Sequence, residues 1–160
     1  MPVAYARPNL PDTLLAAPDF APLSFPVNAS ATLSSEHRGW LNVAYPTLGA
    51  TVHITFTPTN ADSISSVQEN RMERLLLNAG DNYTDFSEFT NPAGFDIIVA
   101  TSEGGLTPLQ FLATDHDKWV VSGAVYFSNP EASTAIDSIK PIVGAIRNDI
   151  VRGLTSLNYK

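Results

Sequence analysis

The chain has 160 residues and no cysteine, and its formal net charge is −7, from nine basic and sixteen acidic residues. This length predicts one domain, and the lack of cysteine excludes disulfides, zinc–cysteine sites and thiol nucleophiles. An acidic protein without a basic run repels phosphate backbones, so we expect no nucleic acid partner. No stretch approaches the roughly 18 apolar residues of a membrane span, and the first residues lack the pattern of a signal peptide.

The first 26 residues contain six of the twelve prolines. Proline fixes φ and has no amide donor, so this region should be extended. We divide the chain into a proline-rich N-terminal tether or strap at residues 1–22 and a single α+β domain at residues 23–160. Phe20, Leu23 and Phe25 favour contact with the domain for the second half of the proline-rich stretch.

Short apolar and alternating runs predict strands in the rest of the chain. The clearest lies at residues 50–57, where one face is apolar and consists of Ala50, Val52, Ile54 and Phe56. We expect strands at 40–45, 50–57, 83–89, 95–101, 107–114 and 118–127. The links within each group of strands are short, which makes neighbouring strands antiparallel.

Two stretches have apolar residues at helical spacing. The first follows Asp62, which we expect to cap the helix, and ends at Gly80. The second follows Asp137 and carries a stripe of Ile139, Val143, Ile146, Ile150, Leu154 and Leu157. The order of elements predicts an α+β fold, with an antiparallel sheet of about six strands sandwiched by helices.

No motif for catalysis, phosphate binding or metal binding occurs in the chain. His37, His53 and His116 lie in different predicted elements, without the spacing of metal ligands. Asp115 and Asp117 flank His116, which is a usual composition of a tight polar turn. We therefore expect no catalytic residue, no cofactor and no metal.

Large aromatic residues on the predicted strands are the best candidates for a binding surface. Core packing is the simpler interpretation of Trp40, Tyr45, Trp119 and Tyr126, because aromatic side chains are usually buried. Exposure would instead indicate a partner surface, since Trp and Tyr dominate binding energy at interfaces. We take Trp40, Tyr45 and Trp119 as interaction candidates.

Taken together, the segments of the chain resemble the gliding-motility lipoprotein family GldD of Bacteroidetes. The resemblance is carried in order by residues 39–46 (GWLNVAYP), 50–54 (ATVHI), 110–115 (QFLATD), 122–127 (SGAVYF), 137–142 (DSIKPI) and 146–150 (IRNDI). No single segment is specific, but their order over most of the chain is. Family members begin with a lipoprotein signal and an acylated cysteine, and this chain has neither. We expect it to be the soluble part of such a protein, starting after the anchor.

The resemblance implies a fold similar to the Mog1/PsbP-type α/β/α sandwich. It also implies a non-enzymatic accessory or scaffolding role in gliding motility and the type IX secretion system, by protein binding. The expected location is the cell envelope, periplasm-facing and held to the membrane by a lipid anchor. Expected partners are other gliding-motility lipoproteins such as GldB or GldJ.

Two other classes of function stay open. One is an enzyme that acts on cell-wall or glycan substrates, with Asp115, His116 and Glu103 as acid–base groups. The other is a small-ligand-binding module with a pocket under one helix.

Overall fold

The computed structural model describes residues 14–15, 23–25, 27–28, 32–34, 39–46, 49–79, 83–102, 107–127 and 136–159. Within these residues, no helix combines the length and the apolar character needed to cross a membrane. Two small antiparallel pairs lie beside the main sheet: β1 (Leu14–Leu15) with β3 (Val27–Asn28), and β2 (Leu23–Ser24) with β11 (Asn158–Tyr159). Leu23 and Phe25 are each 3% exposed and belong to the main core. Phe20 lies outside the described residues.

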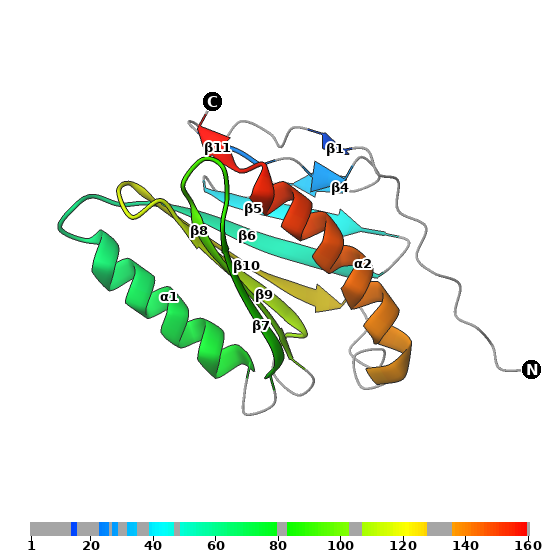
Figure 1. Ribbon diagram of the computed structural model, residues 1–160. Helices are drawn as coiled ribbons and strands as arrows, with labels where there is room; N and C mark the ends of the chain where they lie inside the picture. The colour runs from blue at the N-terminus through cyan, green and yellow to red at the C-terminus, as the bar shows by residue number, and fades with distance from the viewer. Residues whose placement is uncertain are drawn as a thin grey trace, which may run out of the picture.

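The main element is a seven-stranded sheet in which every neighbouring pair is antiparallel (Figure 1). Its strands are β4 (Thr32–Ser34), β5 (Trp40–Tyr45), β6 (Ala50–Pro58), β7 (Tyr83–Thr90), β8 (Asp96–Ser102), β9 (Leu109–Thr114) and β10 (Trp119–Phe127). The order across the sheet is β4-β5-β6-β10-β9-β8-β7. The chain thus forms a first meander of β4, β5 and β6 and then a helix. It continues as a second meander from β7 to β10, and β10 pairs with β6.

The predicted α+β class is confirmed, and the predicted strand number of about six is corrected to seven. All six expected strands are present, with ends shifted by at most two residues. The additional strand is β4, which pairs with β5 through Leu33 and Val43. Three residues are too few to show a period of two, so β4 left no signal in the sequence.

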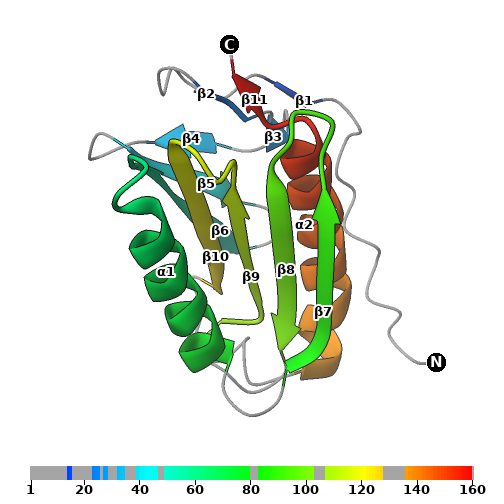
Figure 2. The same cartoon turned by 60° about the vertical axis from the view of Figure 1, so that its left-hand side comes forward.

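The two helices cover opposite faces of the sheet (Figure 2). Helix α1 (Ile64–Ala79) shares an apolar cluster with Leu112 of β9, and helix α2 (Ile136–Thr155) shares the larger cluster with Phe111. Adjacent residues of a strand point to opposite faces, so the helices lie on opposite sides. The layers are therefore helix, sheet and helix, as expected from the apolar stripes.

The predicted stripe of α2 forms the centre of the larger core. Its described members are at most 6% exposed: Val143, Ile146, Ile150, Leu154 and Leu157. They face the apolar side of β6, where the four alternating residues from Ala50 to Phe56 are at most 3% exposed. The ring of Phe25 packs edge-on against Phe56 at 6.3 Å and stacks with Phe111 at 6.1 Å. The side chain of Ile139 is outside the described residues.

The helix starts differ from those predicted. Asn60, not Asp62, binds the start of α1: its Oδ1 accepts the backbone N–H groups of Asp62 at 2.9 Å and Ser63 at 3.0 Å. Asn is as good a cap as Asp, and the sequence offers both within three residues. Helix α2 begins at Ile136, so Asp137 lies inside the helix and not before it. The predicted end of α1 at Gly80 lies outside the described residues.

Candidate functional site

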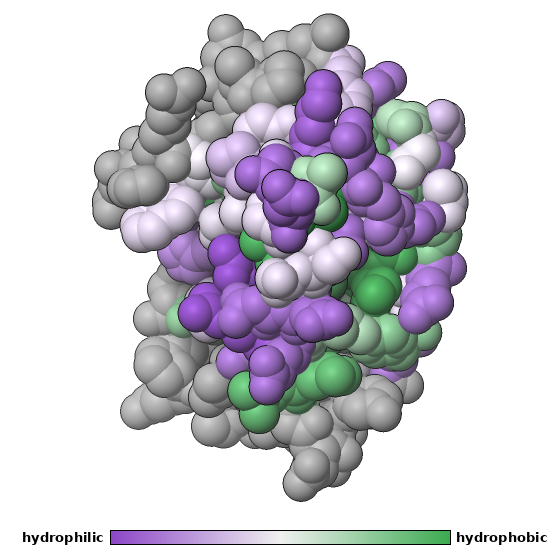
Figure 3. Space-filling view, turned by 90° about the vertical axis from the view of Figure 1, so that its left-hand side faces the viewer, coloured by the Kyte–Doolittle hydropathy of each residue, from purple (hydrophilic) through white to green (hydrophobic). Residues whose placement is uncertain are grey.

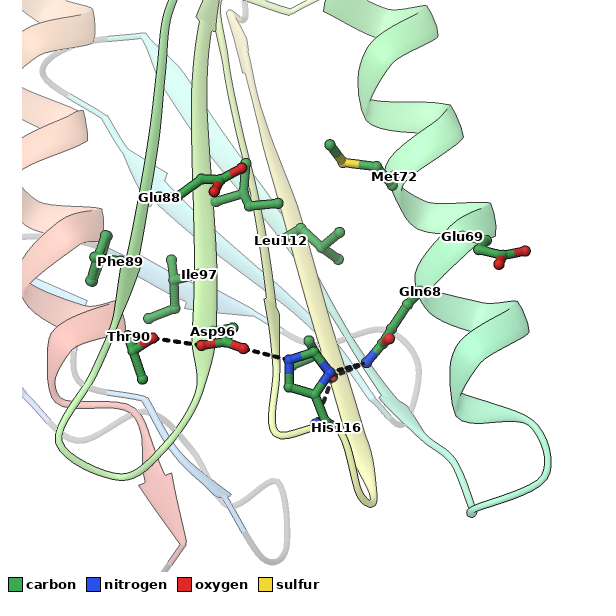
Figure 4. A pocket seen from close by; sticks show the side chains of 12 residues that line it. Gln68, Glu69, Met72, Glu88, Phe89, Thr90, Asp96, Ile97, Leu112 and His116 are labelled. Atoms are coloured by element: carbon green, nitrogen blue, oxygen red, sulfur yellow. Dashed lines mark hydrogen bonds and ion pairs between the residues drawn. The ribbon is translucent and has the colours of Figure 1, made fainter.

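Helix α1 packs over β8, β9 and β10 and leaves a hollow on each of its sides. Figure 3 looks onto this side of the molecule, where hydrophilic residues are interspersed with smaller apolar areas. The larger hollow is a pocket of about 580 Å³ between α1 and strands β7 to β9 (Figure 4). We call it the acidic pocket, because it is lined by three carboxylates and by no lysine or arginine. Its lining is Gln68, Glu69, Met72, Glu88, Phe89, Thr90, Asp96, Ile97, Ile98, Leu112, Thr114 and His116.

A chain of hydrogen bonds runs across one end of the acidic pocket (Figure 4). The hydroxyl of Thr90 donates to Asp96 Oδ1 at 2.6 Å, and His116 Nε2 lies 2.5 Å from Asp96 Oδ2. On the other side of the ring, Gln68 Nε2 lies 3.1 Å from His116 Nδ1 and donates to Thr114 Oγ1 at 2.7 Å. The geometry assigns the tautomer: Nε2–H donates to Asp96, and Nδ1 accepts from Gln68.

The same contacts set the charge state of the carboxylate. The hydrogen bond from Thr90, and then that from His116, hold the pKa of Asp96 below its usual value, because both stabilise the charged form. Both side chains of the pair are about half exposed, at 54% for His116 and 53% for Asp96. Water therefore screens the attraction, and the pair serves mainly to orient the ring.

The turn at residues 115–118 explains why His116 points into the pocket. Asp115 Oδ1 accepts the backbone N–H groups of Asp117, Lys118 and Trp119 at 2.8 to 2.9 Å. His116 has φ of +59°, a conformation that histidine adopts more readily than most residues. The prediction of a tight polar turn is confirmed, and the Asp115 carboxylate binds the backbone of that turn.

The histidine has a partner that sequence reasoning did not find. We considered Asp115 and Glu103 as its acid–base neighbours, but the structure pairs it with Asp96. Asp115 binds the turn instead, and the hydroxyl of Tyr159 donates to its other oxygen. Glu103 lies outside the described residues. Among the described residues, no group of three or more His, Asp or Glu side chains is placed to hold a metal ion.

The comparisons with known proteins decide the family. No curated protein matches the chain. The family described as gliding motility lipoprotein GldD matches residues 2–159, nearly the whole chain. This chain belongs to the GldD family. The resemblance stated from the sequence segments is thereby confirmed, and membership implies a role related to gliding motility and an association with the cell envelope.

The three aromatic interaction candidates of this GldD-family chain lie in three different environments. Trp40 is 51% exposed, on the side of the sheet that carries α1. Tyr45 is 3% exposed, and it therefore belongs to the core and to no surface patch. Trp119 is half-buried and packs against the larger cluster. Only Trp40 keeps the exposure that a partner surface needs.

A second exposed aromatic accompanies Trp40 on this GldD-family chain. Tyr126 of β10 is 42% exposed, and its ring centroid lies 5.2 Å from that of His53 on β6. Trp40, His53 and Tyr126 line the smaller hollow beside α1, together with Arg71 and Arg74. The arginines were missed at the sequence level, although their spacing of three residues places them on one face of a helix.

Proposed function

We propose that this GldD-family chain is a non-enzymatic accessory or scaffolding protein of the gliding-motility and type IX secretion machinery. It acts by protein binding in the cell envelope, with its domain facing the periplasm and a lipid anchor in the full-length protein. We further propose gliding-motility lipoproteins such as GldB or GldJ as its partners. The helix–sheet–helix layering is compatible with the expected Mog1/PsbP-type sandwich, which stays a prediction.

The proposal of protein binding is supported by the difference in exposure between the two faces of strands β5 and β6. On the α2 side, the residues of β5 and β6 are buried, with Leu41, Val43 and Val52 at most 2% exposed. On the α1 side, the same strands expose Trp40 and His53. An exposed tryptophan on a sheet face supports binding of a partner protein there, since Trp is among the residues enriched in binding hot spots.

The test is crosslinking in cells of the full-length, tagged protein, followed by purification from envelopes and mass spectrometry. We expect reproducible recovery of gliding or secretion lipoproteins. An untagged strain and a tagged, unrelated envelope lipoprotein of similar abundance serve as controls. Recovery of the protein alone, at a good crosslinking yield, would contradict the scaffolding role.

The acidic pocket supports a second candidate function, the binding of a small ligand. Its volume of about 580 Å³ is within the usual range of small-molecule sites. The carboxylates of Glu88 and Asp96, together with the apolar side chains of Met72 and Leu112, fit a cationic amine with an apolar body, whereas the Glu69 carboxylate points away from the pocket (Figure 4). Titration with benzylamine should shift the NMR signals of Met72 and His116, whereas neutral benzyl alcohol should not. Equal shifts with both compounds, or none, would remove this candidate.

A glycan-acting enzyme has less support than either binding role. Of its three proposed acid–base groups, Asp115 is bound by the turn, and His116 is held by Asp96 and Gln68. An acid–base residue must reach the substrate proton, and the contacts of Asp115 direct it to the backbone instead.

A further inference from the structure

The smaller hollow beside α1 has a charge opposite to that of the protein. We call it the basic groove; its volume is about 340 Å³. It is lined by two arginines and no carboxylate, in a chain with net charge −7. Its lining is Trp40, His53, Thr55, Arg71, Arg74, Leu75, Asn78, Gln110, Phe111, Ser122, Gly123, Ala124 and Tyr126. Helix α1 thus separates an acidic pocket from a basic groove on one face of the sheet.

The two guanidinium groups have no carboxylate partner among the described residues. Arg71 donates to Asn70 Oδ1 at 2.8 Å and to Thr57 Oγ1 at 3.5 Å, which are both neutral groups. Burial, and then the charge of Arg74, lower the pKa of Arg71. An arginine has five N–H donors, so most of those in the groove stay available for a ligand. Two close cations without a counter-ion attract an anion, and a carboxylate accepts guanidinium donors in pairs.

The floor of the basic groove leaves room for a ligand, and the helix above it is tied to the sheet. Ser122 and Ala124 of β10 present only small side chains between the aromatic residues. Below α1, the buried Gln110 donates from Nε2 to the carbonyl oxygen of Leu75 at 2.9 Å, which ties the helix to β9. A preformed groove loses little conformational entropy when it binds a ligand.

The strand register shows how far apart the two exposed aromatic residues of the groove lie along the strands. Trp40 is opposite Thr55, and Tyr126 is opposite Thr51, four residues further along the same strand. At about 3.3 Å per residue, the two exposed aromatic residues are offset by roughly 13 Å along the strands. This length fits about four residues of an extended peptide and exceeds what a single small anion occupies.

We propose that the basic groove binds a short acidic peptide segment of a partner protein. A carboxylate of the segment pairs with Arg71 and Arg74, and an apolar side chain of the segment packs on Trp40 or Tyr126. Tryptophan, tyrosine and arginine are the residues enriched in binding hot spots, and all three line this groove. The proposal rests on the proposed protein-binding function and names the surface and the chemistry of its partner.

The test is a selection of random displayed 12-residue peptides on the purified chain, followed by affinity measurements with synthetic peptides. We expect the selected peptides to share an aspartate or glutamate next to an apolar residue. Their affinity should fall about tenfold in Arg74→Gln, the size of one exposed charge-assisted contact. The control is Lys118→Gln, which changes the net charge equally at an exposed turn and should change affinity less than twofold.

A second variant tests the shape of the groove without a change in its charge. Ala124→Leu fills the floor of the groove and should also weaken binding of the selected peptides, with the parent fold checked by circular dichroism. Selected peptides without an acidic residue, or peptides that bind Arg74→Gln and the parent equally, would overturn the proposal. If glucuronic acid or inorganic phosphate shifts the Trp40 indole signal while no peptide does, the site is one for small anions and the peptide proposal is wrong.

Crosslinking in cells distinguishes a wrong proposal for the basic groove from a wrong proposed function. If crosslinking recovers the same envelope proteins from Arg74→Gln as from the parent, protein binding stands and the groove is not the interface. If the parent itself recovers no partner, the proposed function fails regardless of the peptide result.

Discussion

Gly123 of β10 lies directly against the ring of Phe111, its neighbour on β9. A Cβ atom at Gly123 would stand 2.2 Å from Cε2 and 2.4 Å from Cζ of that ring. The ring is 1% exposed and stacked on Phe25, so it has little room to move away. The glycine therefore allows the aromatic residue to lie across the centre of the sheet.

Replacing Gly123 by alanine should destabilise the protein. Overpacking of a filled core costs about 1–3 kcal/mol, so we expect Gly123→Ala to lower the free energy of unfolding in urea by that amount. The control is Gly144→Ala on the exposed side of α2, where nothing lies within 4 Å. That change should raise stability by up to ~1 kcal/mol through helix propensity. A Gly123→Ala variant as stable as the parent would refute the packing argument.

Asn91 joins the end of α2 to the hairpin between β7 and β8. Its Nδ2 donates to the carbonyl oxygens of Leu154 at 2.9 Å and Leu157 at 2.8 Å. Its Oδ1 accepts the backbone N–H groups of Ala93 at 3.0 Å and Phe95 at 2.9 Å. Asn91 is 5% exposed and its bonds to Leu154, Leu157 and Phe95 are buried, so these backbone groups cannot easily exchange their partner for water.

We expect Asn91→Ala to lower the free energy of unfolding by about 3 kcal/mol, because the Leu157 carbonyl and the Phe95 N–H lose their buried partner and each such loss costs about 1–3 kcal/mol. Asn91→Asp keeps the acceptor but loses both donors, and should also be destabilising. Asn148→Ala, at an exposed position of α2, is the matched control and should be neutral or slightly stabilising. Equal urea midpoints for Asn91→Ala and Asn148→Ala would contradict the role of Asn91.

The fold was predictable where one local pattern determined each element. The alternation from Ala50 to Phe56 and the stripe from Val143 to Leu157 both depend on residues close in sequence, and both are buried as expected. The role of Asn91 was not predictable, because its partners lie 63 and 66 residues away. From the sequence alone, Asn91-Pro92 predicts only the end of the strand expected at residues 83–89.

The candidate sites depend on contacts that no sequence pattern specifies. His116 meets Asp96 only because β8 and β9 pair in a particular register, with Asp96 opposite Thr114. Trp40 and Tyr45 lie on the same strand, yet the first is exposed and the second is buried. Their separation by five residues puts them on opposite faces, an odd offset that strand periodicity does reveal. Tyr45 lies on the face covered by α2, and Trp40 lies beside α1 on the other face. The sequence did not show which face of β5 each helix covers.

The pairing of Asp96 predicts a specific loss of stability in acid. Its folded-state pKa is lowered, so its contribution is present above the unfolded value of about 3.9 and is lost as the pH falls through the folded value. We expect Asp96→Asn to be less stable than the parent at pH 5 by under ~1 kcal/mol, because the pair is exposed. The difference should shrink between pH 4 and pH 2.5, measured by urea unfolding.

The control for Asp96 is Asp117→Asn, in the same turn as His116. Asp117 is exposed and contributes its backbone N–H to the turn. Its replacement should leave the difference from the parent unchanged with pH. A gap between Asp96→Asn and the parent that stays constant down to pH 2.5 would show that Asp96 gains nothing from Thr90 and His116.

The burial of Tyr45 predicts the opposite behaviour in base. Burial first, and then the negative charge of Asp149, raise the pKa of the Tyr45 phenol, because both disfavour the phenolate. The stability is therefore complete below the unfolded value of about 10 and is lost as the pH rises above it, at up to ~1.4 kcal/mol per pH unit. Tyr45→Phe removes this proton, so its free energy of unfolding should fall less steeply than that of the parent between pH 9.5 and 11.5. Asp149→Asn should make the loss of stability level off at a lower pH than in the parent, because the folded-state pKa is then raised less, although burial still raises it. Identical slopes for Tyr45→Phe and the parent would mean that the Tyr45 phenol ionises without unfolding the core.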